Sequence, residues 1–201
     1  MNAATVFVVD DDEAVRDSIK ELVASVGLNV ETFASAVDFL ETFDDARTGC
    51  LVLDIRMARM SGLALQARLN EIGARIPIVF LTGHADVPTA VAALRAGAQG
   101  FVTKPYREQE LLDGINEALA RDEALLNAAD ESRRFASAVE ALTEREREVM
   151  DLAVVGLSSK VIAQRLGISH RTVELHRSRV LEKLGVGSMA ELIRIAAQRR
   201  R

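Results

Sequence analysis

Residues 5–33, TVFVVDDDEAVRDSIKELVASVGLNVETF, decide the fold of the first half of this chain. A β-branched run at 5–9 is followed by a helical pattern and by a second strand-like run at 29–33, which is typical of a strand–helix–strand unit. Further strand-like runs follow at 50–54, 77–81 and 100–103. Strands that alternate with helices predict an α/β fold, here a five-stranded doubly wound parallel sheet with helices on both faces.

Charged and hydroxyl side chains follow these runs, at the edge of the sheet where parallel α/β folds bind their ligands. They are Asp10, Asp11 and Asp12 after the first run, Asp54 at the end of the third, Thr82 after the fourth and Lys104 after the fifth. Clustered carboxylates repel one another, and Mg²⁺ bound through one or two of them and water relieves that repulsion. A lysine and a hydroxyl nearby supply the charge and hydrogen bond that a phosphoryl group needs as it transfers to a carboxylate. Each residue alone also fits a solvated turn, a helix cap or packing, so the prediction rests on their coincidence.

Four motifs at the strand ends, FVVDDDE (7–13), LVLDIRM (51–57), FLTGH (80–84) and FVTKP (101–105), have the order and positions of one family. Through them, residues 1–120 resemble a response-regulator receiver domain, which has a flavodoxin-like fold. The resemblance implies that a sensor histidine kinase transfers its phosphoryl group to Asp54. It also implies that Mg²⁺ is held by Asp11, Asp54 and the backbone carbonyl of Arg56, with Asp10 assisting through water.

The same resemblance assigns the residues that respond to phosphorylation. Lys104 would pair with the phosphoryl oxygens, Thr82 would hydrogen-bond to them, and Phe101 would turn inward into the space that Thr82 vacates. The bond from Lys104 to Pro105 is a candidate cis peptide bond, because X-Pro bonds reach that form at low energy. The expected output is a homodimer, formed through the fourth helix around residues 87–96 and the fifth strand.

The motifs depart from the family pattern after Asp54, where Met57 is followed by Ala58 instead of proline. Without proline the loop at 56–61 has a less restricted backbone. This departure bears on the rigidity of the loop and not on its chemistry. His84, two residues after Thr82, either influences how quickly water reaches the phosphoaspartate or is a solvent-exposed loop histidine.

Charge is distributed unevenly along the chain. Residues 1–122 contain eleven basic and nineteen acidic side chains, whereas residues 123–201 contain fourteen basic and eleven acidic ones. Residues 158–201 carry ten basic and three acidic side chains, and the arginines at 199–201 explain only part of this excess. A local excess of positive charge predicts a polyanionic partner such as nucleic acid.

Residues 121–141 form the expected boundary between two domains, 1–120 and 142–201. The segment is alanine-rich and charged, without Pro or Gly, which predicts a helical linker or an extension of the fifth helix. Six of its residues and neighbours have the spacing of a weak coiled-coil seam: Leu125, Ala128, Ser132, Phe135, Val139 and Leu142. This spacing fits a dimerising linker or a helix that packs on its own domain.

The second domain is predicted to be all-α, with four helices. Thr143 with Glu146, and Ser188 with Glu191, are capping boxes at the start of the first and last helix. Between them, residues 158–184 contain two helical patterns separated by the turn LGIS (166–169), which is typical of a helix-turn-helix. In such a unit the second helix enters the major groove and the first crosses the phosphate backbone.

Three motifs of the second domain, LTEREREV (142–149), GLSSKVIA (156–163) and TVELHRSRVLEKL (172–184), resemble the LuxR/NarL/FixJ-type DNA-binding domain. With the receiver, the chain is similar to FixJ-type response regulators. The resemblance implies that four residues face base edges: Thr172, Glu174, Leu175 and Ser178. Five others are better placed for phosphates, which position a protein on DNA without specifying sequence: Lys160, Arg171, His176, Arg177 and Arg179.

These features predict a regulator of transcription that binds double-stranded promoter DNA, with RNA polymerase as a further partner and at most slow self-dephosphorylation. Two alternatives stay open. One is a phosphatase with an aspartyl nucleophile, which Asp10-x-Asp12 superficially permits, although Ala14 stands where that superfamily has Thr or Val. The other is a constitutive or ligand-gated DNA-binding protein whose receiver fold works without phosphorylation.

A single cysteine, Cys50, excludes an internal disulfide framework and a Cys-rich zinc site. It is expected to be a small core residue. No apolar run approaches about 18 residues, and the first residues lack the basic start of a signal peptide. The sequence therefore predicts a cytoplasmic protein with no membrane partner.

Overall fold

The computed structural model describes residues 4–83 and 87–199. The chain divides into two compact units, Met1–Asn127 and Ala128–Arg201. Within the described ranges, no helix is both long enough and apolar enough to cross a membrane.

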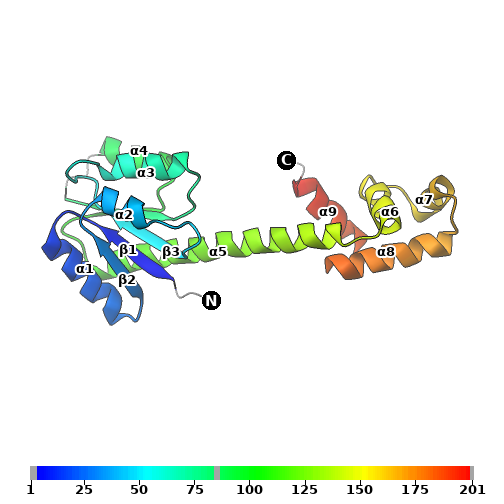
Figure 1. Ribbon diagram of the computed structural model, residues 1–201, viewed down its shortest axis with the longest axis horizontal. Helices are drawn as coiled ribbons and strands as arrows, with labels where there is room; N and C mark the ends of the chain where they lie inside the picture. Colours follow the sequence, from blue (N-terminus) through cyan, green and yellow to red (C-terminus); the bar gives the residue numbers. More distant parts are fainter. Residues whose placement is uncertain (1–3, 84–86, 200–201) are drawn as a thin grey trace. The chain divides into compact units, whose positions relative to one another are not determined.

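The first unit is an α/β fold whose parallel sheet has the strand order β2-β1-β3-β4-β5 (Figure 1). Its strands are β1 (Thr5–Val9), β2 (Asn29–Phe33), β3 (Gly49–Leu53), β4 (Ile78–Thr82) and β5 (Gly100–Thr103). Its helices are α1 (Glu13–Ser25), α2 (Ala36–Thr42), α3 (Gly62–Glu71), α4 (Val87–Arg95) and α5 (Glu108–Glu140). The predicted fold class is confirmed.

The third and fourth strands are displaced by one residue from the predicted runs. β3 ends at Leu53, so Asp54 is the first residue after the strand, and β4 begins at Ile78 and ends at Thr82. The Asp54 N–H still donates to the carbonyl of Val9 at 2.9 Å. This bond extends the pairing of β1 and β3 by one step and brings Asp54 next to the end of β1.

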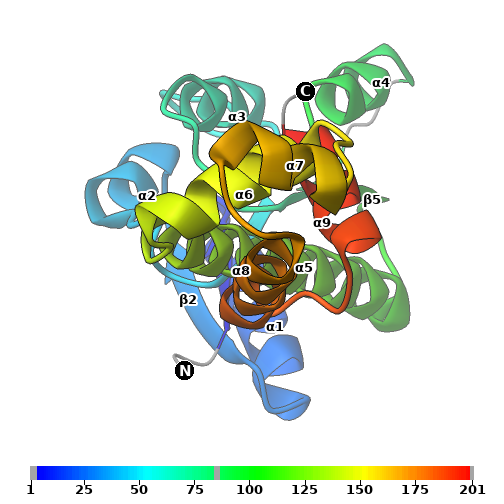
Figure 2. The same cartoon turned by 90° about the vertical axis from the view of Figure 1, so that its right-hand side faces the viewer.

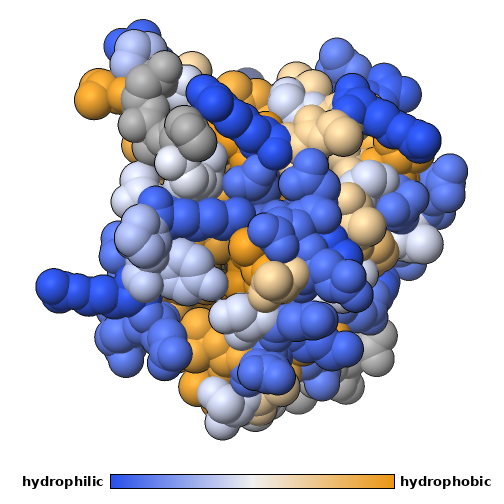
Figure 3. All heavy atoms as spheres, turned by 90° about the vertical axis from the view of Figure 1, so that its left-hand side faces the viewer, coloured by the Kyte–Doolittle hydropathy of each residue, from blue (hydrophilic) through white to orange (hydrophobic). Residues whose placement is uncertain are grey.

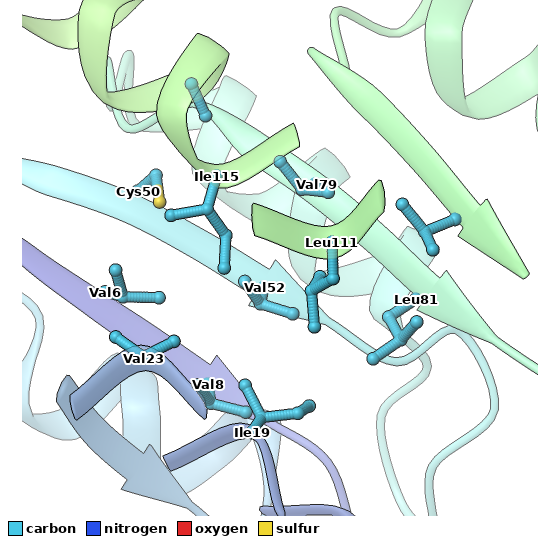
Figure 4. Close-up of a cluster of buried hydrophobic side chains, with 12 residues drawn as sticks. Val6, Val8, Ile19, Val23, Cys50, Val52, Val79, Leu81, Leu111 and Ile115 are labelled. Carbon is cyan, nitrogen blue, oxygen red and sulfur yellow. The ribbon is translucent and has the colours of Figure 1, made fainter. Parts of the chain in front are cut away.

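Two apolar layers enclose the sheet, because successive strand residues point to opposite faces. On one face, Val6 and Val8 pack with Ile19 of α1 and Ile115 of α5 (Figure 4). Cys50 belongs to this layer and is fully buried, as predicted, and burial raises the pKa of its thiol to about 12. The other face is covered by α2, α3 and α4.

The second unit is all-α, as predicted (Figures 1 and 2). It begins with the last part of α5. Four whole helices follow: α6 (Glu144–Val154), α7 (Ser159–Leu166), α8 (His170–Leu184) and α9 (Met189–Arg199). Left-handed glycines end α7 and α8, at Gly167 and Gly185. The capping box of Thr143 and Glu146 is present. At the last helix, Ser188 accepts from the Glu191 N–H, but the Glu191 carboxylate accepts from Gly187 and not from Ser188.

The segment between the predicted domains continues the fifth helix, since α5 runs without a break to Glu140. Phe135 and Val139 pack in the core of the second unit beside the buried Leu142. Of the other three seam positions, Leu125 is partly exposed and Ala128 and Ser132 are exposed. The end of the helix therefore packs on its own unit, which was one of the two options left by the sequence.

Candidate functional site

The carboxyl edge of the sheet collects the predicted acidic side chains. β1 and β3 are neighbours with Val9 opposite Leu53, so Asp10 and Asp54 leave the sheet side by side. Asp10, Asp54 and Thr82 are 2%, 7% and 1% exposed. Seen from the end where β1 leads into α1, this side of the first unit is mostly hydrophilic, with apolar side chains between the charged ones (Figure 3).

Lys104 joins the two buried aspartates. Its Nζ lies 2.5 Å from Asp10 Oδ2 and 3.4 Å from Asp54 Oδ1. Asp54 Oδ2 also accepts from the N–H of Arg56 at 2.9 Å. Burial raises the pKa of Asp54, Lys104 opposes that effect, and the charge of Asp10 adds to it. Burial lowers the pKa of Lys104, but the hydrogen bonds and charges of Asp10 and Asp54 together outweigh it and raise that pKa.

Arg16 is a residue of this edge that the sequence analysis missed. Its Nη1 donates to the backbone carbonyl of Asp10 at 2.8 Å, from the second turn of α1. Asp12 accepts from the N–H groups of Ala14 and Val15 as the N-cap of the same helix. A basic residue six positions after the first aspartate is the only signal in the sequence for this contact.

The loop after Asp54 is held by a bond that a proline would remove. The N–H of Ala58 donates to Asp11 Oδ2 at 3.1 Å, and proline has no such N–H. Arg59 adopts a left-handed conformation with φ of 67°, and Met60 N–H returns to the Ala58 carbonyl at 2.8 Å. The substitution that we expected to loosen the loop therefore gives it a connection to Asp11.

The donor chemistry of this edge suits a hard cation, because carboxylate and carbonyl oxygens are the ligands that Mg²⁺ prefers. Among the residues that the structure describes, no three His, Cys, Asp or Glu side chains stand together as a metal site. The predicted set does not need three, since it combines Asp11, Asp54 and the Arg56 carbonyl with water. Burial disfavours the ionised form of Asp54 and raises its pKa, so a bound cation would stabilise that carboxylate.

Two further predicted residues of the first unit lie on neighbouring strands, with Thr82 at the end of β4 and Phe101 second in β5. Thr82 is buried at the end of β4, and its carbonyl accepts from the Lys104 N–H at 2.8 Å. Phe101 is partly exposed, with its ring centroid 6.4 Å from that of Phe80. The Lys104–Pro105 bond is cis, as predicted. His84 lies outside the described residues.

In the second unit, α8 has a buried stripe and a polar free face. Val173, Val180 and Leu184 are buried. Of the residues assigned to DNA, Thr172, His176 and Arg177 are partly exposed. The other six are exposed: Lys160, Arg171, Glu174, Leu175, Ser178 and Arg179.

Two of the partly exposed residues are also engaged inside the unit. Arg177 Nη1 donates to the Oγ of the buried Ser159 on α7 at 2.5 Å, so part of the donor set that we assigned to phosphates holds α7 against α8. Thr172 Oγ1 lies 2.8 Å from the Oγ of Ser169, the N-cap of α8. His176 Nδ1 is buried without a hydrogen-bond partner.

An ion pair between a half-exposed lysine and a buried glutamate fixes the other end of α8. Lys183 Nζ donates to Glu146 Oε2 at 2.7 Å, and the same oxygen accepts from the Thr143 N–H at 2.9 Å. These bonds lower the pKa of Glu146 to about 2. The sequence predicted the cap but not Lys183, which is 37 residues further along the chain.

Comparisons with known proteins agree with both units. Residues 6–116 match the response regulator receiver domain, and residues 140–196 match the LuxR family of bacterial regulatory proteins. The chain is 46% identical over 192 residues to transcriptional regulatory protein TdiR of Thauera aromatica, covering 96% of this chain and 85% of the relative. It is 47% identical over 195 residues to the C4-dicarboxylate transport transcriptional regulatory protein DctR of Rhodobacter capsulatus, covering 95% and 98%.

Solved structures give the same result. The response regulator StyR superposes with a TM-score of 0.82 at 43% identity, over 98% of this chain and 99% of that one. Full-length FixJ from B. japonicum superposes with a TM-score of 0.61 at 37% identity, over 96% of each chain.

Proposed function

The chain belongs to the response regulators that join a receiver domain to a LuxR-family DNA-binding domain, and we propose that Asp54 accepts the phosphoryl group. The observation that carries this proposal is the position of Asp54 at the carboxyl end of β3, beside Asp10 and Lys104. Asp10 is paired closely with Lys104, whereas Asp54 shares that lysine at a longer distance and keeps a raised pKa. Burial raises the pKa of Asp54 in spite of these partners, and a more basic carboxylate is a better nucleophile.

Asp54 attacks the phosphorus of a phosphohistidine on a sensor histidine kinase. A bond forms between an Asp54 oxygen and phosphorus, the phosphorus–nitrogen bond breaks, and its electron pair stays on the histidine nitrogen. Lys104 binds the phosphoryl oxygens and stabilises their charge. The N–H of Arg56 holds the second oxygen of Asp54.

Asp11, Asp54 and the carbonyl of Arg56 would hold Mg²⁺, and Asp10 would assist through water. When bound, the cation neutralises charge on the phosphoryl oxygens. Arg16 donates to the backbone carbonyl of Asp10 and holds that residue at the end of β1. The Asp10 carboxylate accepts from Lys104 and so orients the lysine.

Phosphorylation shifts a pre-existing equilibrium through Thr82 and Phe101. The output surface is α4 with β5, where Val87, Val91 and Leu94 are 77%, 40% and 47% exposed. Residues at these spacings share one face of a helix, and an exposed apolar row of this kind favours association with a second copy. The active state is therefore a homodimer.

The second unit reads promoter DNA with α8. Thr172, Glu174, Leu175 and Ser178 face base edges, and Glu174 accepts from a cytosine amino group. Five residues contact phosphates: Lys160, Arg171, His176, Arg177 and Arg179. The dimer recruits or excludes RNA polymerase at the promoter, and these partners place its action in the cytoplasm.

The phosphatase alternative is not favoured, because Asp12 caps α1 with its side chain and is committed to that contact. The protein acts as a phosphoryl acceptor with at most slow self-dephosphorylation. The constitutive alternative differs in one measurable way, since it needs no phosphoryl group for DNA binding.

Intact mass after incubation with acetyl phosphate and Mg²⁺ tests the acceptor. Wild type and Asp17→Asn, a change at an exposed aspartate of α1, should gain one phosphoryl group and shift toward dimer on a sizing column. Asp54→Ala should do neither. Equal phosphoryl gain by Asp54→Ala would refute the assignment, and DNA binding without any gain would favour the constitutive alternative.

DNA duplexes enriched from a randomised pool test the second unit. Lys160→Ala should weaken binding to all duplexes alike and reduce the salt slope by about 1. Glu174→Gln should instead relax the preference at one base pair, by about 1–3 kcal/mol. Equal effects of the two variants on every duplex would contradict the division into phosphate and base contacts.

A further inference from the structure

Two amide side chains of α3 contact the end of α4. Gln66 is 2% exposed, and its Nε2 donates to the Ala93 carbonyl at 3.1 Å. Asn70 Nδ2 donates to the Ala96 carbonyl at 2.9 Å. Because residues four apart lie on one face of a helix, Gln66 and Asn70 form a row along α3, which we call the amide pair.

The end of α4 depends on contacts of this kind. Within α4 only Ala93 is buried, whereas Val87, Val91 and Leu94 are exposed. Carbonyls in the last turn of a helix lack partners within the helix. The Ala93 carbonyl accepts from the Ala98 N–H at 3.0 Å as well as from Gln66, and the Ala96 carbonyl accepts from Asn70. The amide pair thus binds the carbonyls where α4 stops.

The first residue of α3, Gly62, packs directly against the backbone of Asp54. The N–H of Gly62, the first residue of α3, donates to the Ile55 carbonyl at 2.9 Å. A Cβ at Gly62 would lie 2.2 Å from the Asp54 carbonyl oxygen, so only glycine fits. The Oγ of Ser61 caps the helix by accepting from Ala64. A ten-residue helix is about 15 Å long, so α3 links the contacts at Asp54 to those at the end of α4.

We propose that the amide pair couples the backbone at Asp54 to α4, so that phosphorylation moves the end of α4 through α3. This route is separate from Thr82 and Phe101, which lie on β4 and β5. The inference rests on the proposed function, in which Asp54 is phosphorylated and α4 carries the dimerising surface. Gln66 and Asn70 are positioning residues, because they act through α4 and not on the phosphoryl group.

Amide hydrogen exchange of the full chain, with and without acetyl phosphate and Mg²⁺, tests the coupling. The variants are Gln66→Met, which keeps the shape of the side chain without its donor, and Asn70→Ala, which changes an exposed side chain and leaves the core intact. Each should speed exchange around residues 93–98 about fivefold. Each should also reduce the phosphorylation-dependent change in exchange over 87–98 to less than half, while the phosphoryl gain by intact mass stays at the wild-type level.

Arg68→Gln is the matched control, because it removes only an exposed ion pair with Glu71 on the same helix. It should behave as wild type in both states. Wild-type exchange over 87–98 in Asn70→Ala, in both states, would overturn the coupling even if Gln66→Met failed to fold. Absence of any phosphoryl gain in wild type would instead remove the acceptor itself, so the two failures are distinguishable.

Discussion

The carboxyl edge of the first unit and the start of α6 in the second each bury a carboxylate beside a lysine, with opposite results. Lys183 lies 2.7 Å from Glu146, whose oxygen also accepts from Thr143, and the pKa of Glu146 falls to about 2. At Asp54, burial outweighs the opposing effect of Lys104, which lies closer to Asp10, and the pKa of Asp54 rises. A carboxylate with a full set of partners stabilises the fold, whereas one that shares its lysine keeps its capacity to react.

Removing Lys104, the lysine that Asp10 and Asp54 share, should produce the largest effect, a slower gain of the phosphoryl group. Lys104→Met removes the ammonium group that binds the incoming phosphoryl oxygens beside the proposed Mg²⁺ site, so the rate of phosphoryl gain from acetyl phosphate should fall about a hundredfold. Lys20→Met, at an exposed lysine of α1, is the control and should be neutral. An unchanged rate in Lys104→Met would break the comparison, because Lys104 would then be structural like Lys183.

Removing the charge of Glu146, the carboxylate with a full set of partners, should lower the free energy of unfolding. The pKa of Glu146 is about 2 in the folded state and 4.5 ordinarily, so its stabilisation is present above about pH 4.5 and lost as the pH falls toward 2. Because Lys183 is 38% exposed and partly screened, we expect Glu146→Gln to lower the free energy of unfolding by about 2 kcal/mol at pH 7. Urea unfolding at pH 7 and pH 3 measures this.

Glu148→Gln is the matched control for that measurement. Glu148 pairs with Arg145 on the exposed side of the same helix, so its loss should change stability by less than about 0.5 kcal/mol. A pH-independent deficit in Glu146→Gln would point to lost packing and not to the ion pair.

Removing the charge of Asp54 should instead raise the free energy of unfolding. The raised pKa of Asp54 means that its ionised form destabilises the folded state above the ordinary Asp range. Asp54→Asn should therefore raise the free energy of unfolding by about 1 kcal/mol at pH 7, and the gain should vanish below about pH 4. Calorimetric unfolding beside Asp17→Asn checks it, and a destabilised Asp54→Asn would mean that Lys104 compensates Asp54 fully.

The smallest expected effect, on Mg²⁺ affinity, concerns the loop that follows Asp54 and contacts Asp11. Ala58→Pro removes the N–H that binds Asp11 and frees that carboxylate for a cation. Mg²⁺ binding, measured by calorimetry, should tighten about threefold. Ala58→Gly keeps the N–H and should bind as wild type, so equal affinities in all three proteins would show that the bond has no influence.

Local patterns were sufficient to predict the fold. The strand-like runs of β1, β2 and β5, the cap at Thr143 and the glycine turn at Gly167 are signals within a few residues. The meeting of Asp10, Asp54 and Lys104 was also predictable, because the carboxyl ends of parallel strands lie at the same edge of the sheet.

Contacts that depend on the exact path of loops could not be predicted. Ala58 binds Asp11 across 47 positions, and Arg177 reaches Ser159 because α7 and α8 cross at a particular angle. Lys183 and Glu146 belong to different helices, so their pairing appears only once α8 has packed. Sequence patterns predict which elements form, whereas these polar contacts follow from how the elements pack.

The burial of Cys50 has a practical consequence. It is the one cysteine of the chain, fully buried in β3, with a thiol pKa of about 12. A thiol in that state is inert toward maleimide reagents at neutral pH, because the thiolate is the reacting form. A single cysteine introduced on the exposed face of α4 or α8 could therefore carry a fluorophore or spin label in an otherwise natural chain, with no cysteine to remove first.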